Sequence, residues 1–240
     1  MAKEVIVNAK KIKKRKKIFK ITKISLACLL LFLIFIFIIL NVIYKGGRFT
    51  VSLDKRLALD SKIVLYEDDE IKEEKRTLEA RDLEFMDNIS IDWLPQNIDN
   101  EANGSHNGEN YIAYTFYIAN NGEEIINYWY SVIIDDVIKN VDEAARVMVF
   151  LNGEKTVYAK KSSYTNEEEP GTKAFYSKDT AVLEQRKFFS PGSIDKFTVV
   201  IWLEGDDPEC NDNILGGEIK MHMEIREEHK GEENGKETKE

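Results

Sequence analysis

The chain has 240 residues and a formal net charge of −9, and its charges are unevenly distributed. The first 23 residues hold ten Lys and Arg against a single acidic residue, Glu4, whereas residues 45–240 hold 24 Lys and Arg against 42 Asp and Glu. An acidic segment of this size excludes recognition of nucleic acid by electrostatic attraction. It also has one cysteine, Cys210, so a hydrophobic core and not an internal disulfide must hold it together.

A run of 21 uncharged residues, Ile24–Tyr44, follows the basic segment and consists mostly of Leu, Ile and Phe. A helix rises about 1.5 Å per residue and the hydrocarbon core of a bilayer is about 30 Å thick, so this run can cross a membrane once. Lys and Arg beside a span stay on the cytoplasmic side. The sequence therefore predicts a basic cytoplasmic tail (residues 1–23), a transmembrane helix in the lipid bilayer (24–44) and an extracellular remainder.

A secretory signal peptide is the main alternative to a retained anchor. Signal peptides have an apolar region of about 7–15 residues, followed by small residues at the cleavage site. Here the run is longer, and the bulky or charged residues Ile43, Tyr44 and Lys45 stand where a signal peptidase needs small ones, although Gly46 and Gly47 leave cleavage open. We expect the span to be retained, with Cys28 as one of its apolar residues.

Residues 45–96 carry weaker patterns. Apolar residues alternate in Arg48–Leu53, as in a strand with one buried face, and Ile63–Tyr66 is a second short apolar run. Further apolar residues at spacings typical of strands are Leu78, Leu83, Phe85, Ile89, Ile91 and Trp93. We expect these membrane-proximal strands to belong to the same domain as the residues that follow.

Residues 97–225 carry the strongest strand signals. Asn120-Asn121-Gly122 and Asn152-Gly153 offer the positive φ that tight turns between strands need. The expected strands are Tyr111–Ala119, Ile125–Ile134, Arg146–Leu151, Lys155–Ala159, Lys196–Leu203 and Glu218–Ile225. Short strands separated by turn signals predict an all-β fold, an antiparallel β-sandwich. The charged residues 226–240 are expected to be a disordered tail.

One acidic segment resembles the first half of a calcium-binding loop. Asp99, Glu101 and Asn103 alternate before Gly104, and such loops place oxygen ligands at every second residue ahead of a glycine. The match is incomplete, because Asn110 stands where the bidentate Glu would be. A solvated turn without an ion is the alternative.

A second acidic segment, residues 204–213, crowds several carboxylates into one loop. Crowded carboxylates repel one another unless solvent or a cation screens them. We take Asp206, Asp207 and Asp212 as candidate calcium ligands, with a solvated loop as the alternative.

No catalytic motif is present. His106, His222 and His229 lack the spacing of a zinc hydrolase, and the chain has no G-x-S-x-G, Walker or dinucleotide-binding motif. We therefore expect a protein that is not an enzyme. A pair of catalytic carboxylates that meets only in the fold is left open.

Three turn patterns, each tied to a strand, carry a family resemblance over Tyr111–Ile225. They are Asn120-Asn121-Gly122 after Tyr111–Ala119, Phe189-Ser190-Pro191-Gly192 before Phe197–Trp202, and Asn213–Gly217 before the last strand. In this order they resemble the camelysin and biofilm-matrix fibre proteins of Gram-positive bacteria. The resemblance implies a jelly-roll-like domain exported to the cell surface, with fibre members assembling by lending a strand to a neighbour.

The chain departs from that family at its N-terminus. The exported fibre members lose a cleaved signal, whereas this chain is expected to keep its span. A protease activity has been attributed to camelysin, and no metal motif here supports carrying it over.

Together these patterns predict a single-pass membrane protein that displays a β-sandwich outside the cell and acts by binding or assembly. Strand addition at an open sheet edge would join it to other surface proteins. The alternatives are a secreted or surface hydrolase with a carboxylate or metal site assembled by the fold, and an envelope sensor or accessory subunit whose basic tail docks a partner. The sequence indicates no particular ligand, partner or oligomeric state, and no role for Cys210.

Overall fold

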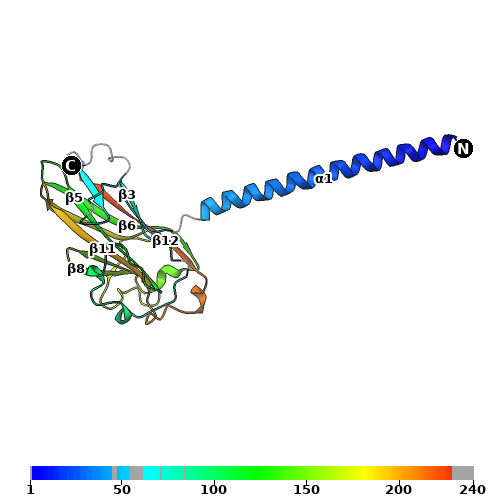
Figure 1. The fold of residues 1–240 in the computed structure, drawn as a ribbon. Coiled ribbons are helices and arrows are strands. Elements are labelled where there is room, and N and C mark those ends of the chain that lie inside the picture. The colour runs from blue at the N-terminus through cyan, green and yellow to red at the C-terminus, as the bar shows by residue number, and fades with distance from the viewer. Residues whose placement is uncertain (1, 45–47, 55–61, 71, 84, 229–240) are drawn as a thin grey trace, which may run out of the picture. The chain divides into compact units, whose positions relative to one another are not determined.

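The chain forms two compact units, Met1–Gly46 and Gly47–Glu240. The computed structural model describes residues 2–44, 48–54, 62–70, 72–83 and 85–228, and it describes the helix side chains from residue 14 to residue 39. The first unit is a single helix, α1 (Ala2–Tyr44), and the second consists mainly of strands (Figure 1).

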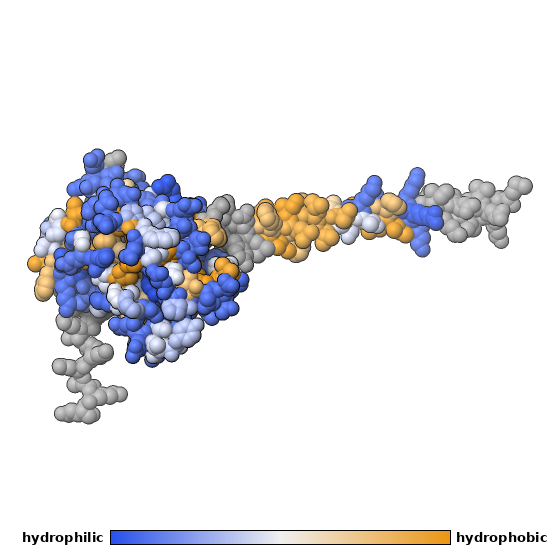
Figure 2. All heavy atoms as spheres, turned by 90° about the horizontal axis from the view of Figure 1, so that it is seen from below, coloured by the Kyte–Doolittle hydropathy of each residue, from blue (hydrophilic) through white to orange (hydrophobic). Residues whose placement is uncertain are grey.

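Helix α1 contains one stretch, Lys14–Ile39, that is long and apolar enough to cross a membrane. Its Leu, Ile and Phe side chains are exposed all round, and Figure 2 shows the continuous apolar surface that they form. A helix that is apolar on every side is suited to lipid or to a protein interior. The predicted spanning helix is thus present. Near an N-terminus, such a helix fits an anchor or a signal sequence.

The strands form two sheets. Sheet A has the order β10 (Thr180–Phe189), β6 (Ile126–Ile138), β12 (Glu218–Glu227), β1 (Thr50–Leu53), β3 (Thr77–Glu79). Sheet B has the order β2 (Ile63–Tyr66), β5 (Tyr111–Asn120), β11 (Ile194–Leu203), β7 (Ala145–Leu151), β8 (Glu154–Ala159), β9 (Lys173–Ala174), and β4 (Gly104–Ser105) also pairs with β5. Four short 3-10 helices complete the domain: η1 (Ile91–Trp93), η2 (Ile98–Asn100), η3 (Val141–Glu143) and η4 (Asp212–Ile214).

Both sheets are mixed, so the expectation of a purely antiparallel fold is wrong. Strand β1 runs parallel to β12, and β8 runs parallel to β9. A parallel pair needs a long connection between its strands, and nearly the whole domain lies between β1 and β12 in the sequence. Local turn signals cannot reveal a pairing of this kind.

The turn at Asn120-Asn121-Gly122 does not close a hairpin, because β5 lies in sheet B and β6 lies in sheet A. The buried Asn120 side chain donates from Nδ2 to the carbonyl oxygens of Glu124 and Phe189, both at 2.9 Å, and its Oδ1 accepts from Gly122 N. These bonds fix a corner between the sheets. The hairpin predicted at Asn152-Gly153 is confirmed, with φ values of 53° and 86°.

One hydrophobic core draws on both sheets. Val132 and Met223 from sheet A and Phe116 and Val199 from sheet B are fully buried in the same cluster. The rings of Tyr130 on β6 and Phe197 on β11 meet edge to face, with centroids 5.1 Å apart. The two sheets therefore face each other across this core.

A second cluster lies on the opposite face of sheet B. Val200 and Trp202 alternate with the residues of the main core along β11, so they point away from sheet A. Ile89, Leu94 and Ile98 cover them from the segment between β3 and β5. The strands expected around Leu83–Trp93 do not form in the described residues. This segment forms η1 and then η2 instead, and Trp93 is exposed.

Two further differences concern strands. Strand β10 was not predicted, because the four polar residues at its centre, Glu184 to Lys187, leave it without an apolar alternation. Strand β12 extends to Glu227, so Arg226 and Glu227 are ordered and not part of a disordered tail. Residues 229–240 of the expected tail lie outside the described residues.

A polar network joins the two sheets at Asp195 on β11, which is buried. Its carboxylate accepts hydrogen bonds from Tyr128 Oη on β6 and from Asn152 Nδ2, both at 2.7 Å. It also pairs with Arg186 Nε on β10 at 3.1 Å. Burial, with the Asp195 carboxylate, raises the pKa of Tyr128, so its hydroxyl stays protonated as a donor.

We expect Asp195→Ala to destabilise the domain by about 3 kcal/mol, because it leaves the buried Tyr128 hydroxyl without an acceptor. Chemical unfolding of the full chain in detergent micelles measures this loss. Asp179→Ala is the matched control, since it removes an exposed carboxylate paired with the exposed Lys178 and should cost little. Equal losses for the two variants would contradict the role given to the network.

Candidate functional site

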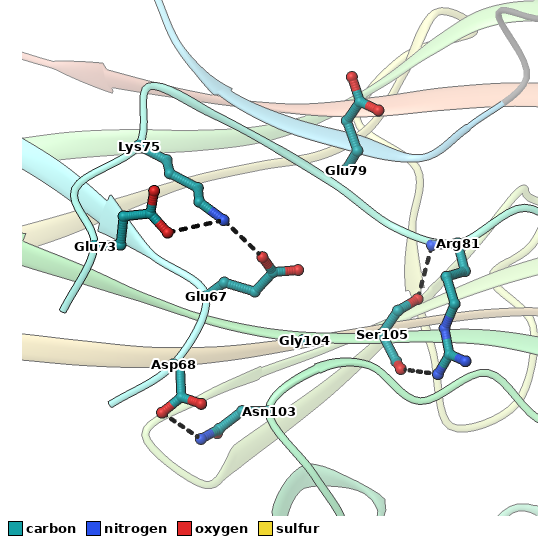
Figure 3. A pocket seen from close by; sticks show the side chains of 9 residues that line it. All are labelled: Glu67, Asp68, Glu73, Lys75, Glu79, Arg81, Asn103, Gly104 and Ser105. Atoms are coloured by element: carbon teal, nitrogen blue, oxygen red, sulfur yellow. Dashed lines mark hydrogen bonds and ion pairs between the residues drawn. The ribbon is translucent and has the colours of Figure 1, made fainter. Parts of the chain in front are cut away.

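A charged hollow of about 450 Å³ opens on the surface of the domain beside β2, β3 and β4 (Figure 3). Its wall comes from three chain segments: the residues after β2, those around β3, and the short strand β4. The lining residues are Glu67, Asp68, Glu73, Lys75, Glu79, Arg81, Asn103, Gly104 and Ser105. Acidic, basic and amide groups thus share one open site.

Glu67 is held at the centre of one wall. Its Oε2 lies 3.1 Å from Lys75 Nζ, and its Oε1 accepts a hydrogen bond from Tyr114 Oη at 3.0 Å. The hydrogen bond to Glu67 raises the pKa of Lys75, and burial followed by the Glu67 charge raises that of Tyr114. Glu67 is therefore a fixed anion whose charge Lys75 balances.

The opposite wall is fixed through backbone contacts. Arg81 donates from its guanidinium to the carbonyl oxygen of Ser105, and Ser105 Oγ accepts from Arg81 N at 2.8 Å. Gly104 has φ +66°, and a Cβ there would lie 3.3 Å from the Glu67 side chain, so glycine fits this position best. The hollow can accept a polar ligand that offers donors and acceptors together.

The first predicted calcium ligands do not converge. Asp99 Oδ2 accepts from the neighbouring Asn100, Glu101 lies 3.8 Å from His106 Nδ1, and Asn103 turns toward the hollow. Asn103 Oδ1 accepts from Tyr117 Oη at 2.6 Å. These side chains therefore serve different contacts, and calcium binding by this set stays a prediction.

The second predicted set is also divided. Asp206 Oδ2 accepts from Ser90 Oγ at 2.7 Å, and Asp212 begins η4 on the surface. Asp207 instead points inward, where Arg146 binds its Oδ2 and Glu209 N donates to its Oδ1 at 2.8 Å. The structure thus separates Asp207 from the two residues that were grouped with it.

Asp207 has a partner, Glu169, that sequence reasoning missed. Glu169, Asp207 and Glu209 offer carboxylate oxygens within 4.8 Å of one another. Glu169 comes from the loop after β8, so only the tertiary fold brings it to the loop after β11. No local spacing in the sequence signals this group.

Two other reactive side chains among the described residues, Cys210 and His222, contact a neighbouring side chain. Cys210 Sγ accepts a hydrogen bond from Asn88 Nδ2 at 3.2 Å, and burial raises the pKa of its thiol. A raised thiol pKa reduces the thiolate fraction and with it the nucleophilicity of the sulfur. His222 Nδ1 lies 2.8 Å from Asp135 Oδ2 on the surface. His229 lies outside the described residues.

Comparisons with known proteins add little. No family model matches the chain, and no curated protein matches it. One solved structure is similar at 12% sequence identity, a β-glucosidase from Kluyveromyces marxianus in complex with glucose, with a TM-score of 0.22. The match covers 67% of this chain and 15% of that protein. A similarity at this level carries no argument about fold or function.

Burial makes His106 a source of acid sensitivity. Its Nε2 lies 2.9 Å from Thr115 Oγ1, its Nδ1 is buried without a hydrogen bond, and burial lowers its pKa. The unfolded chain therefore binds a proton at His106 more readily than the folded chain does. The stability that neutral, buried His106 contributes is complete above about pH 6.5, and it is lost as the pH falls through the pKa of His106 in the folded chain.

We expect His106→Gln to lose less stability than the parent chain between about pH 7.5 and 5.5, because glutamine does not titrate. Equal shifts in the urea midpoints of the two proteins would contradict this.

Proposed function

We propose that this protein is a single-pass membrane protein whose β-sandwich domain, of the jelly-roll-like kind, lies outside the cell and acts by binding or assembly without turnover. The observation that carries the proposal is the apolar stretch of α1, with basic residues before it and an acidic β domain after it. Basic residues stay on the cytoplasmic side of a span, which puts the domain after the span on the opposite side.

The resemblance of Tyr111–Ile225 to camelysin and biofilm-matrix fibre proteins supports a role in the envelope or matrix of a Gram-positive bacterium. Strand β1, which pairs in parallel with β12, lies outside the resembling segment. The jelly-roll-like assignment therefore rests on the order of strands and turns between β5 and β12.

Strand addition would use β10. Among the described residues, the sheets end in β10 and β3 and in β2 and β9. Strand β10 has ten residues, whereas the other three have two to four. Its register against β6 is regular from Val182 to Arg186, with irregularities on both sides. An extended segment of another surface protein has room to pair along this regular stretch.

Phe188 supports binding at this edge. It has φ +58°, which is strained for a residue with a Cβ, and its ring is 76% exposed. It lies in the irregular part of β10, where Asn127 Oδ1 accepts from its backbone N at 3.0 Å. Bulges re-aim side chains, and strain kept at an exposed aromatic residue is typical of a contact site.

The two alternatives use other features. A hydrolase would use the carboxylates of the charged hollow, but there Glu67 is balanced by Lys75, and Glu79 pairs with Arg48. A general acid instead needs a carboxyl group whose charged form is disfavoured. A sensor or accessory subunit would dock its partner on the basic residues of α1. The described residues show no contact that supports such docking.

Phe188→Gly should stabilise the domain by about 1 kcal/mol, because glycine adopts positive φ without a steric penalty and the exposed ring adds little burial. Phe188→Ala is the matched control, since it removes the ring and keeps the strain. Urea unfolding measures both variants. An equal or lower midpoint for Phe188→Gly than for Phe188→Ala would refute the strain.

Orientation is tested with single cysteines in a Cys28→Ser/Cys210→Ser background. Lys178→Cys replaces a side chain that is 87% exposed on the β domain, and Lys14→Cys lies in the basic part of α1. In intact cells, a membrane-impermeant maleimide should label the residue at 178, whereas labelling at 14 should require permeabilisation. The reverse pattern would place the domain in the cytoplasm and end the proposal.

A further inference from the structure

Three acidic side chains, of which Asp207 and Glu209 are buried and Glu169 is partly buried, meet at the contact between two loops. Glu169 lies in the loop between β8 and β9, and Asp207 and Glu209 lie in the loop after β11. One carboxylate oxygen from each lies within 4.8 Å of the other two. Oxygen atoms that both lie about 2.4 Å from one ion can be at most about 4.8 Å apart, so this spacing allows a shared cation.

The group carries more negative charge than its surroundings balance. The Asp207 side chain is fully buried, and that of Glu169 is 12% exposed. Arg146 on β7 binds Asp207 and lies 3.9 Å from Glu169, so among the described residues one guanidinium pairs with a group that holds three carboxylates. Buried charges without a counter-charge are costly, since they lose hydration.

Glu209 provides an independent sign of a missing ligand. The residue is 5% exposed, and its Oε1 accepts from Ser162 Oγ, Ser163 N and Ser163 Oγ. Its Oε2 is buried and has no hydrogen-bond partner. A buried carboxylate oxygen without a partner is rare in folded proteins, and a bound ion is one of its usual causes.

The same imbalance acts on Glu169. Burial raises its pKa, and the charges of Asp207 and Glu209 add to the effect while Arg146 opposes it. A cation held among the three carboxylates would favour their ionised forms.

We propose that Glu169, Asp207 and Glu209 bind one divalent cation that prefers oxygen ligands, with calcium as the best fit. The group contains no nitrogen or sulfur ligand, which disfavours zinc and copper. Calcium accepts flexible sets of six to eight oxygens, including bidentate carboxylates, whereas magnesium demands a near-ideal octahedron. The cation would join the loop after β8 to the loop after β11.

Neighbouring groups already hold the carboxylates in place. The serines fix Glu209, and Arg146 with Glu209 N fixes Asp207. Contacts of this kind orient metal ligands in characterised sites. This set shares only Asp207 with the ligands expected from the sequence, and it does not depend on which side of the membrane the domain faces.

The test is calorimetric titration of CaCl₂ into the full chain in detergent micelles, after removal of metal by a chelator. We expect one site per chain with a Kd of about 10⁻⁴–10⁻³ M, as in extracellular calcium modules, and weaker binding of MgCl₂. At a calcium concentration of about ten times Kd, the thermal midpoint should rise by roughly 3–6 °C.

Glu209→Gln should weaken calcium binding at least about tenfold, because it removes the charge of the unpartnered carboxylate. Its amide oxygen can still accept from the serines, and Glu169→Gln is the second variant if the first does not fold. Asp212→Asn is the matched control and should bind as the parent does.

Three results would overturn the proposal: no saturable binding up to about 10 mM calcium, ten times the weakest affinity expected; equal affinity in the parent and in Glu209→Gln; or loss of binding in Asp212→Asn with retention in Glu209→Gln. The last result would favour the ligand set first expected from the sequence.

Discussion

Strand β1 is the element on which the domain depends. It lies between β12 and β3 in sheet A, pairing Thr50–Leu53 with His222–Ile225 on one side and with Thr77–Glu79 on the other. Phe49, Val51 and Leu53 are buried in the main core. The strand that begins six residues after the end of α1 is therefore part of the fold, and among the described residues β3 has no other partner in sheet A. A chain cut near Gly46 would keep β1, so the domain itself does not decide between an anchor and a cleaved signal.

Sheet B is buried on both faces, which leaves the edges and loops of the domain for binding. Sheet A covers one face, and the segment with Ile89, Leu94 and Ile98 covers the other. Glu204 secures this cover, since its Oε2 accepts from Ile91 N at 3.1 Å and from Trp202 Nε1 at 3.0 Å. Both faces of this sheet are thus closed to a partner. The β10 edge, the charged hollow and the carboxylates of two loops are left as surfaces on which binding can act.

Local pattern explains what the sequence could and could not predict. Alternation predicted β1 and β12, which bury one face, whereas β5 and β11 are mostly apolar because both of their faces are covered. The corner at Asn120 was mistaken for a hairpin, because its bond to the Phe189 carbonyl comes from a residue distant in sequence. The acidic group with Glu169 was missed for the same reason. Asp206 and Asp212 lie in the same acidic loop, but Asp206 binds Ser90 and Asp212 is exposed at the start of η4.

The proposed function depends on retention of the helix, since a tethered domain and a secreted subunit assemble differently. The most direct measurement is the intact mass of the chain extracted from the membrane fraction of cells that make it. Retention predicts a chain of 27.7 kDa that includes α1. A shorter chain that begins near Gly46 and is recovered outside the membrane would contradict it.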